Sequence, residues 1–303
     1  MPPLPLVYSN YLEPPVFRPP SEAQSLILQA TLGCSHNACT FCGSYRTKQF
    51  RVKPFNQFRA EIEALARIHG IRPKRIFLAD GDAFVLSTAQ LLEILNLLTQ
   101  EFPGVERISI YASGTNIQQK SNDELAQIRQ AGLRLIYIGL ESGDDQVLTF
   151  VNKGISNHEH ITACLRLKAA GFILSPIIIL GLGGKAWSHQ HATNTALTIN
   201  AIDPPYLAAL TLMLVPGTPL YAQAQRGDFE PLDPLEILQE LRLLVEGLTD
   251  LSECVFRTNH ASNYLPLRGV LSQDHKRLLA SIDSVLKDPH AIRYLRPDYI
   301  RGL

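Results

Sequence analysis

The sequence predicts an α/β fold in which parallel strands alternate with helices, forming a sheet that is either rolled into a barrel or left open. Short, continuously apolar runs recur between residues 26 and 214, as is typical of parallel strands covered on both faces. Between these runs lie amphipathic segments that begin with helix-start signals and end at a glycine. Strand, helix and strand in this order require right-handed crossovers within one parallel sheet.

Six strands are expected in this repeating part of the chain. They cover residues 26–31, 75–79, 108–112, 135–140, 173–180 and 207–214.

The helices between the strands are predicted from their apolar faces and from the residues at their ends. Phe58, Ile62 and Leu65 share one face at helical spacing. Three serines that stand three residues before a Gln or Glu have the capping-box pattern and mark helix starts: Ser87, Ser121 and Ser156. Three glycines are expected where helices end: Gly70, Gly132 and Gly171.

Three regions are expected along the chain. Residues 1–24 form a proline-rich N-terminal arm, residues 25–220 hold the repeating strands and helices, and residues 221–303 form an α-rich extension. In the extension, Asp233 and Pro234 open a helix to about Gly247, and Ser272 opens another to about Leu286. No flexible linker precedes the extension, so we expect it to cover the sheet.

Composition and charge favour a globular protein with no overall attraction to nucleic acid. Of 303 residues, 46% are apolar and 18% are charged, with 28 basic and 28 acidic side chains. The densest basic run, Arg46–Lys53, is interpreted as a solvated loop. The N-terminus does not have the pattern of a signal peptide, and the longest apolar stretch, Pro176–Leu180, is too short to cross a membrane. We therefore expect a cytoplasmic protein whose five cysteines are metal ligands or buried thiols instead of disulfides.

Three of the cysteines, Cys34, Cys39 and Cys42, lie together immediately after the first predicted strand. Three thiolates can hold a 4Fe–4S cluster and leave one iron without a protein ligand. The alternative is a closed structural zinc site made by the same cysteines and His36. Cys164 and Cys254 lie far away in the sequence, and we expect them to be small buried apolar residues.

These residues resemble the signature of the radical S-adenosylmethionine (SAM) superfamily, in a variant CxxxxCxxC form with an aromatic residue, Phe41, before the last cysteine. The family's first cysteine gap has three residues, whereas this chain has four. Residues 79–83 stand where the family has a Gly-Gly-Glu segment, here replaced by Asp80, Gly81 and Asp82, and residues 181–184 resemble its glycine-rich turn. Residues 138–143 and 216–219 resemble segments of the elongator, methylthiotransferase and HemN-like branch. The resemblance covers about residues 25–220 and implies a partial (β/α)6 barrel.

The resemblance also implies roles for individual residues. Cys34, Cys39 and Cys42 would hold the 4Fe–4S cluster, with SAM on the open iron. The other expected cofactor-binding residues are Phe41, Asp80, Gly81, Asp82, Ser113, Glu141, Gly181 and Gly183, with Ser175 and Gly184 as further candidates. Gly81 and Asp82 would meet the amino group of SAM, Glu141 the ribose, and the glycine-rich turn the adenine. The structural alternatives are loop caps for Asp80 and Glu141, and a tight turn without a ligand for the glycines.

The function implied by the resemblance is reductive cleavage of SAM to a deoxyadenosyl radical that acts on a small-molecule substrate. A flavodoxin or ferredoxin would supply the electron, and no nucleic acid or membrane partner is expected. Asn259, His260 and Asn263 are candidates for the substrate cavity, and the alternative for them is a buried polar network. His36 is expected to orient the cluster segment and not to be a ligand.

Two other classes of protein fit the sequence. One is a zinc-stabilised α/β binding protein without catalysis. The other is an iron–sulfur protein that keeps the fold for binding or delivery, as haem chaperones of the superfamily do.

Overall fold

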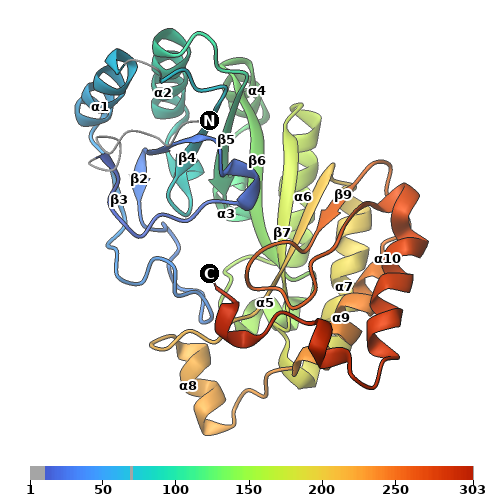
Figure 1. Ribbon diagram of the computed structural model, residues 1–303. Coiled ribbons are helices and arrows are strands. Elements are labelled where there is room, and N and C mark those ends of the chain that lie inside the picture. Colours follow the sequence, from blue (N-terminus) through green and yellow to red (C-terminus); the bar gives the residue numbers. More distant parts are fainter. Residues whose placement is uncertain (1–10, 69–70, 303) are drawn as a thin grey trace. The chain divides into compact units, whose positions relative to one another are not determined.

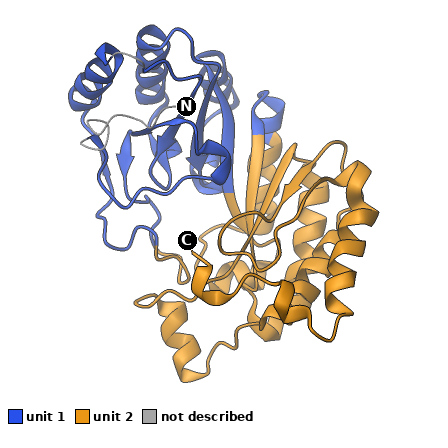
Figure 2. Ribbon diagram, in the orientation of Figure 1, with its two compact units in different colours: residues 1–37, 44–138, 166–173 blue, residues 38–43, 139–165, 174–303 orange. Residues whose placement is uncertain are grey.

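The computed structural model describes residues 11–68 and 71–302 (Figure 1). The chain forms two compact units, coloured separately in Figure 2. The first unit contains residues 1–37, 44–138 and 166–173, and the second contains residues 38–43, 139–165 and 174–303.

The first unit is built on parallel strands in the order β1-β4-β5-β6. These strands are β1 (Leu26–Gln29), β4 (Arg75–Ala79), β5 (Arg107–Ala112) and β6 (Leu133–Glu141). The last three residues of β6 belong to the second unit. Two short strands, β2 (Thr31–Leu32) and β3 (Arg51–Val52), form a separate antiparallel pair. The buried residues of β4 and β5 are almost all apolar, as expected for strands covered on both faces.

The α-helices described in the first unit are α1 (Phe55–Arg67), α2 (Thr88–Glu101), α3 (Gly114–Gln118) and α4 (Asn122–Gln130). The predicted starts of α2 and α4 and the predicted end of α4 are confirmed. Ser87 and Ser121 form the predicted capping boxes at the starts of α2 and α4. Gly132 follows α4 with a φ of 109°, a left-handed conformation that glycine adopts at little cost. The predicted helix end at Gly70 lies outside the described residues.

The second unit contains β7 (Ile173–Leu180), which begins at the boundary of the two units, and β8 (Tyr206–Thr211). Two short strands from the C-terminal part, β9 (Val255–Arg257) and β10 (Arg268–Val270), extend this sheet. β7 is parallel to β8 and β8 is parallel to β9, whereas β10 is antiparallel to β9. The region expected to be an α-rich extension therefore also supplies strands to the sheet edge.

Among the described residues, six α-helices belong wholly or partly to the second unit. They are α5 (Asp145–Phe150), α6 (Asn157–Ala169), which ends in the first unit, α7 (Gly184–Ile202), α8 (Pro219–Arg226), α9 (Pro234–Gly247) and α10 (Leu271–Leu286). Within this unit α9 contacts both α7 and α10, and Figure 1 shows the three helices side by side. Asp233 and Glu236 form a capping box at the start of α9, as predicted.

One predicted helix start is wrong. Ser272 does not cap α10, because the helix already begins at Leu271. Instead, the Asp274 carboxylate accepts a hydrogen bond from the Val270 backbone N–H at 2.8 Å. The acidic side chain in the first turn satisfies the helix start from inside the helix.

The predicted α/β fold class is confirmed: six parallel strands, β1 and β4–β8, alternate with helices in the two units. The interpretation of the basic run as a solvated loop is wrong for two of its residues. Lys48 and Lys53 are largely buried, because each forms an ion pair with a carboxylate of the first unit.

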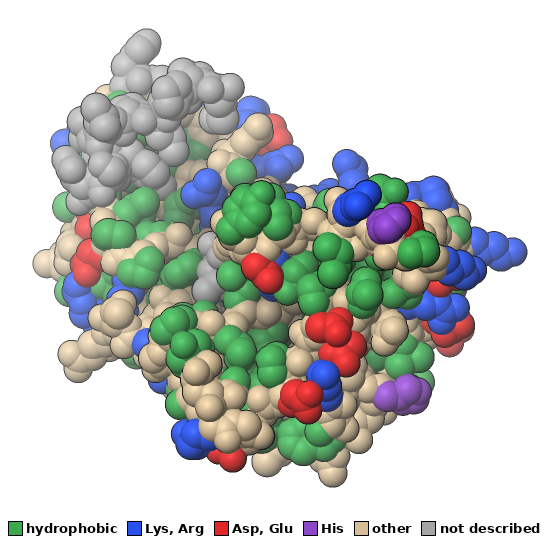
Figure 3. Space-filling view, turned by 60° about the horizontal axis from the view of Figure 1, so that its bottom comes forward, with side chains coloured by type: hydrophobic (Ala, Val, Ile, Leu, Met, Phe, Trp, Pro, Cys, Tyr) green, Lys and Arg blue, Asp and Glu red, His purple; other side chains and the backbone are tan. Residues whose placement is uncertain are grey.

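No helix among the described residues is long and apolar enough to span a membrane. On the face drawn in Figure 3, basic and acidic side chains both occur among apolar ones, in keeping with the equal numbers of the two charges.

Candidate functional site

Each unit carries part of the set of residues that the sequence singles out. The first unit holds Cys34, Asp80, Gly81, Asp82 and Ser113. The second unit holds Cys39, Phe41, Cys42, Glu141, Ser175, Gly181, Gly183, Asn259, His260 and Asn263.

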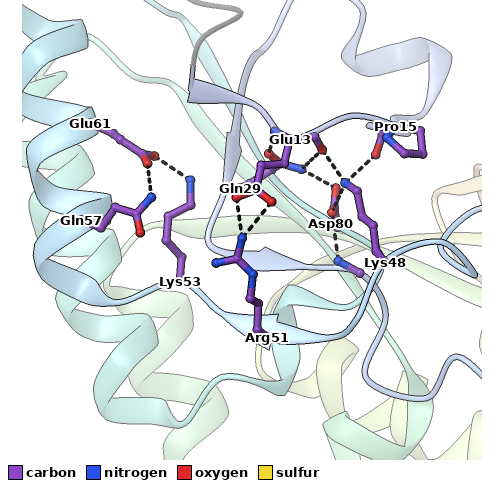
Figure 4. A network of polar contacts seen from close by, with 10 residues as sticks. Glu13, Pro15, Gln29, Lys48, Arg51, Lys53, Gln57, Glu61 and Asp80 are labelled. Atoms are coloured by element: carbon purple, nitrogen blue, oxygen red, sulfur yellow. Dashed lines mark hydrogen bonds and ion pairs between the residues drawn. The ribbon is translucent and has the colours of Figure 1, made fainter.

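Asp80, directly after β4, is a fully buried carboxylate whose hydrogen bonds fix the chain around the first cysteine (Figure 4). Its Oδ2 accepts from the Gly33 N–H at 3.0 Å and from Lys48 Nζ at 2.8 Å. Its Oδ1 accepts from Gln29 Nε2 at 3.0 Å. With a cation and two neutral donors on it, Asp80 positions the backbone immediately before Cys34.

The N-terminal arm is held by the same network. Lys48 Nζ also donates to the Pro15 carbonyl at 2.7 Å and to the Glu13 carbonyl at 2.5 Å. Gln29 and Glu13 exchange two hydrogen bonds, from Glu13 N to Gln29 Oε1 and from Gln29 Nε2 to Glu13 O. Figure 4 shows the arm and the loop around Lys48 joined through these contacts.

Gly81 lies against the first cysteine. A Cβ atom on Gly81 would come within 3.2 Å of the Cys34 Cβ and 2.6 Å of the Tyr45 ring. The Gly81 N–H donates to the Gly33 carbonyl at 3.2 Å. Only glycine permits this close approach of the turn after β4 to Cys34.

Asp82 is buried and surrounded by neutral hydrogen-bond donors. Its carboxylate accepts from Ser35 Oγ at 2.8 Å, from the Ser113 N–H at 3.1 Å and from the Asn116 side-chain amide. Burial raises the pKa of Asp82, and these hydrogen bonds oppose the increase. Because the carboxylate is 1% exposed and already holds Ser35 and Ser113, it organises the residues next to Cys34.

The segment 38–43, with Cys39 and Cys42, is fastened within the second unit by backbone hydrogen bonds. The Thr40 N–H donates to the Val151 carbonyl at 2.9 Å, and the Thr40 carbonyl accepts from the Leu220 N–H at 3.0 Å. Asn152 Nδ2 donates to the Ala38 carbonyl at 3.1 Å. The start of α8, where Leu220 lies, thus contributes to holding the segment with the two cysteines.

Phe41 anchors this segment in an apolar cluster. Its ring packs against a buried core of Val147, Val151 and Leu182. Gly43 allows a close approach to Val215, because a Cβ there would lie 2.7 Å from a methyl carbon of that side chain. The aromatic residue before the last cysteine therefore has a packing role in its own unit.

Glu141, the last residue of β6, has a left-handed backbone conformation with a φ of 65°. Non-glycine residues adopt this region rarely, and it is often found at functional positions. Its carboxylate forms an ion pair with Lys153, at 2.8 Å between Oε1 and Nζ.

The glycine-rich turn at residues 181–184 is buried and packed against the C-terminal part of the second unit. Gly181 and Gly184 have φ values of 80° and 57°. A Cβ on Gly184 would lie 2.7 Å from the Phe229 ring and 2.8 Å from the Glu230 carbonyl oxygen. The turn therefore needs glycine for both its conformation and its close packing.

The candidate substrate residues do not share one environment. Asn263 is buried, where Oδ1 accepts from Thr211 Oγ1 at 2.9 Å and Nδ2 donates to the Ala209 carbonyl at 2.9 Å. His260 is partly exposed and pairs through Nδ1 with Ser262 Oγ at 2.9 Å. Asn259 is exposed. Asn263 thus belongs to a satisfied polar network, the structural alternative for this segment.

The three clustered cysteines are partly exposed, and His36 is exposed. Within its described residues, neither unit by itself gathers three His, Cys, Asp or Glu side chains around a metal position. Cys164 and Cys254 are fully buried, and burial raises the pKa of each thiol to about 12. Their expected role as buried apolar residues is confirmed.

Sequence reasoning missed the partners of these residues. Lys153 was not identified, nor were Asn116, His191 and Glu240, which bond to predicted residues or to their neighbours. Only Lys153 carried a signal, because it follows the predicted Glu141 segment closely in the sequence. The others come from separate helices, so that no local pattern connects them.

These features define an α/β protein of parallel strands with a cysteine-rich segment after the first strand. The model of the radical SAM superfamily matches residues 28–194, more than half of the chain. The chain belongs to the radical SAM superfamily.

Relatives and solved structures agree with this assignment. The chain is 23% identical over 201 residues to the "Heme chaperone HemW" of Bacillus subtilis, covering 64% of this chain and 52% of that protein. The structure of coproporphyrinogen III oxidase (HemN) from Escherichia coli matches with a TM-score of 0.55 and 19% identity, covering 73% of this chain and 52% of that chain. The structure of methylornithine synthase (PylB) matches with a TM-score of 0.53 and 17% identity, covering 88% and 83%. These structures share the fold, and the chain spans about half of the length of HemW.

Proposed function

We propose that this protein is a radical SAM enzyme of the cytoplasm that binds a 4Fe–4S cluster through Cys34, Cys39 and Cys42 and acts on a small molecule. Three thiolates on a short segment are the donor set of such a cluster, and they leave one iron open for SAM. When bound, the reduced cluster supplies the electron that cleaves SAM to methionine and a deoxyadenosyl radical. A flavodoxin or ferredoxin is the proposed electron donor.

The observation that carries the proposal is the close approach of the turn at Gly81 to Cys34 in the first unit. The turn after β4 is where the superfamily meets the amino group of SAM. Here a Cβ on Gly81 would lie 3.2 Å from the Cys34 Cβ, so a side chain at this position would fill the space beside the first cysteine. Backbone carbonyls in this turn can accept hydrogen bonds from an ammonium group beside the cluster.

The residues of the second unit fit the remaining parts of SAM. Glu141 can accept hydrogen bonds from both ribose hydroxyls, because a carboxylate has several acceptor sites. The ion pair with Lys153 holds this carboxylate at the end of β6. Gly181 and Gly183 provide a turn without side chains, against which a flat adenine ring can lie.

The buried carboxylates have supporting roles in this proposal. Asp80 fixes Gly33 before the first cysteine, and Asp82 fixes Ser35 after it. Asp80 acts on the backbone before Cys34 and Asp82 on the side chain after it, so that the cysteine is preorganised before the cluster binds.

Cleavage of SAM in the absence of a substrate tests the proposal. Anaerobically reconstituted protein, reduced with dithionite and supplied with SAM, should form 5′-deoxyadenosine. The matched controls are Cys42→Ala, which removes a proposed ligand, and Cys254→Ala, which removes a buried thiol. Product with Cys254→Ala and none with Cys42→Ala is the expected result. No product from wild-type protein with a full cluster would contradict the enzyme function.

A second candidate function is iron–sulfur-dependent handling of haem without SAM cleavage. The likeness to a protein named as a haem chaperone favours it. Titration of the reconstituted protein with haemin, followed by its Soret absorbance, distinguishes the two candidates. Saturable haem binding without 5′-deoxyadenosine formation would favour this second function.

A further inference from the structure

A buried carboxylate from the C-terminal part of the second unit is bonded to the glycine-rich turn. Glu240, on α9, is 2% exposed and lies outside the residues 28–194 that match the superfamily. Its Oε1 accepts a hydrogen bond from the Gly181 backbone N–H at 2.6 Å. Its Oε2 accepts one from Ser188 Oγ at 2.5 Å, on the first turns of α7.

The same helix also limits the space around the turn. A Cβ on Gly181 would lie 2.7 Å from Ile237 Cδ1, one turn before Glu240 on α9. The next residues after the turn are held from the same side, since the Lys185 N–H donates to the Glu230 carbonyl at 2.9 Å. The conformation of the turn is therefore set by residues 230–240 as well as by its own glycines.

The network continues to the end of β6. The Nε2 atom of His191, on α7, lies 3.7 Å from Glu240 Oε1. The same nitrogen donates a hydrogen bond to the Ile179 carbonyl at 3.0 Å. With Nε2 as the donor, Nδ1 is left to accept from Ser142 Oγ at 2.8 Å. Ser142 directly follows Glu141. One buried chain of contacts therefore joins the turn at Gly181 to the residue after Glu141.

We infer that Glu240 is a positioning residue for SAM: it holds the Gly181 turn in the shape that receives the adenosyl part, without contacting the ligand itself. The inference rests on the proposed function, because it assigns the turn to SAM. An N–H buried without an acceptor is costly, so the backbone at Gly181 would rearrange if Glu240 lost its oxygens. The cysteine segment 38–43 is not bonded to Glu240, so cluster binding should be unaffected.

Three substitutions separate these effects. Glu240→Leu removes both acceptor oxygens and replaces the carboxylate with an apolar side chain of similar size. Glu240→Gln keeps one oxygen for the Gly181 N–H, and its amide can donate to Ser188, since a hydroxyl both donates and accepts. Glu246→Leu, on the same helix with a side chain that is 52% exposed, is the matched control.

The experiment measures SAM affinity by calorimetry on anaerobically reconstituted protein of known iron content, and the electron paramagnetic resonance of the reduced cluster at saturating SAM. Glu240→Leu should bind SAM about tenfold more weakly, consistent with one unsatisfied buried N–H. Glu240→Gln and Glu246→Leu should stay within about threefold of wild type. Iron content and the resonance change at saturation should match wild type in all three, which a general loss of structure would not give.

Each outcome bears on one of the two proposals. Wild-type protein with a full cluster that binds no SAM would contradict the proposed function. Equal SAM affinities of wild type and Glu240→Leu would contradict the role of Glu240. The role would also be contradicted if Glu240→Gln and Glu240→Leu lost SAM affinity to the same extent. If Glu240→Leu does not fold, Ser188→Ala decides: it leaves Oε2 without its donor, and an unchanged SAM affinity would contradict the inference.

Discussion

Lys153 forms a nearly buried ion pair with Glu141, with 2.8 Å between Nζ and Oε1 and side chains that are 11% and 12% exposed. Glu141 ends β6 with a left-handed backbone, and Lys153 follows α5 between Asn152 and Gly154, which also have positive φ angles of 53° and 75°. The pair therefore connects two segments of unusual backbone conformation. It also balances the charge of the carboxylate that we propose for the SAM ribose.

The first prediction concerns this pair. Removing either partner leaves a charge with little access to water, so Lys153→Met and Glu141→Gln should each lower the free energy of unfolding by roughly 1–3 kcal/mol. The double variant should lose less than the sum of the two. Urea unfolding of the four proteins, followed by the fluorescence of the single tryptophan, Trp187, measures the coupling. Additive losses would show that the two side chains do not interact.

The second prediction separates the clustered cysteines from the buried ones. Burial raises the pKa of Cys164 and Cys254 to about 12, so that almost no reactive thiolate forms at pH 8. In metal-free protein, iodoacetamide should label the partly exposed Cys34, Cys39 and Cys42 well before the other two. Mass spectrometry of peptides after timed labelling measures the rates, and labelling in urea is the control. Equal rates for Cys164 and Cys42 in folded protein would contradict the assignment.

The strands and helices of the repeating region could be predicted because their signals are local. The apolar run of Arg75–Ala79 lies within five residues, and the Ser87–Gln90 capping box within four. The strands β9 and β10 have three residues each, too few to show periodicity, and the sequence alone does not distinguish them from loops. Their place at the sheet edge depends on pairing with residues far away in the chain.

The sequence motifs of the candidate site could be predicted, but the residues that bond to these motifs could not. Glu141 and Gly181 were identified by the pattern around them, whereas their bonds to Lys153 and Glu240 are tertiary contacts. Lys48 is expected in solvent as part of a basic run, and its burial is explained by Asp80 and by the carbonyls of Glu13 and Pro15, which are distant in the sequence. Charged residues are placed by their partners, and a single sequence does not show which residues those are.

The third prediction concerns His160, a buried residue of α6. Burial lowers the pKa of His160 to about 3, with a smaller contribution from Lys153. In the folded protein this imidazole therefore stays neutral, whereas in the unfolded chain it takes up a proton below about pH 6.5. Because the unfolded state binds the extra proton, stability falls as the pH decreases from 6.5 towards 3.

The change in stability from this group should be roughly 2 kcal/mol between pH 7.5 and pH 5. His160→Leu removes the titration, so the variant should lose less stability than wild type over this interval. Urea unfolding at the two pH values measures the difference, and His189→Gln, an exposed histidine of α7, is the control. The same pH dependence in wild type and His160→Leu would contradict the neutral buried state.

The fourth prediction compares two ion pairs of the network in Figure 4. Asp80 is fully buried and binds Lys48, whereas Glu13 and Arg51 are 51% and 50% exposed. Asp80→Ala leaves the Gly33 N–H without its acceptor and the largely buried Lys48 without its opposite charge, and should cost roughly 3–5 kcal/mol of stability. Glu13→Gln loses a pair that water screens, and should cost less than about 1 kcal/mol.

The two variants should also differ in cluster binding, because Asp80 holds the backbone before Cys34 and the Glu13 side chain does not. Iron per protein after anaerobic reconstitution should decrease in Asp80→Ala and stay at the wild-type level in Glu13→Gln. Thermal unfolding of the metal-free proteins separates a loss of fold from a loss of cluster affinity. Since Asp80→Asn keeps one oxygen for the Gly33 N–H, its iron content should lie between those of wild type and Asp80→Ala. Full iron content in folded Asp80→Ala would mean that Cys34 is positioned without this carboxylate.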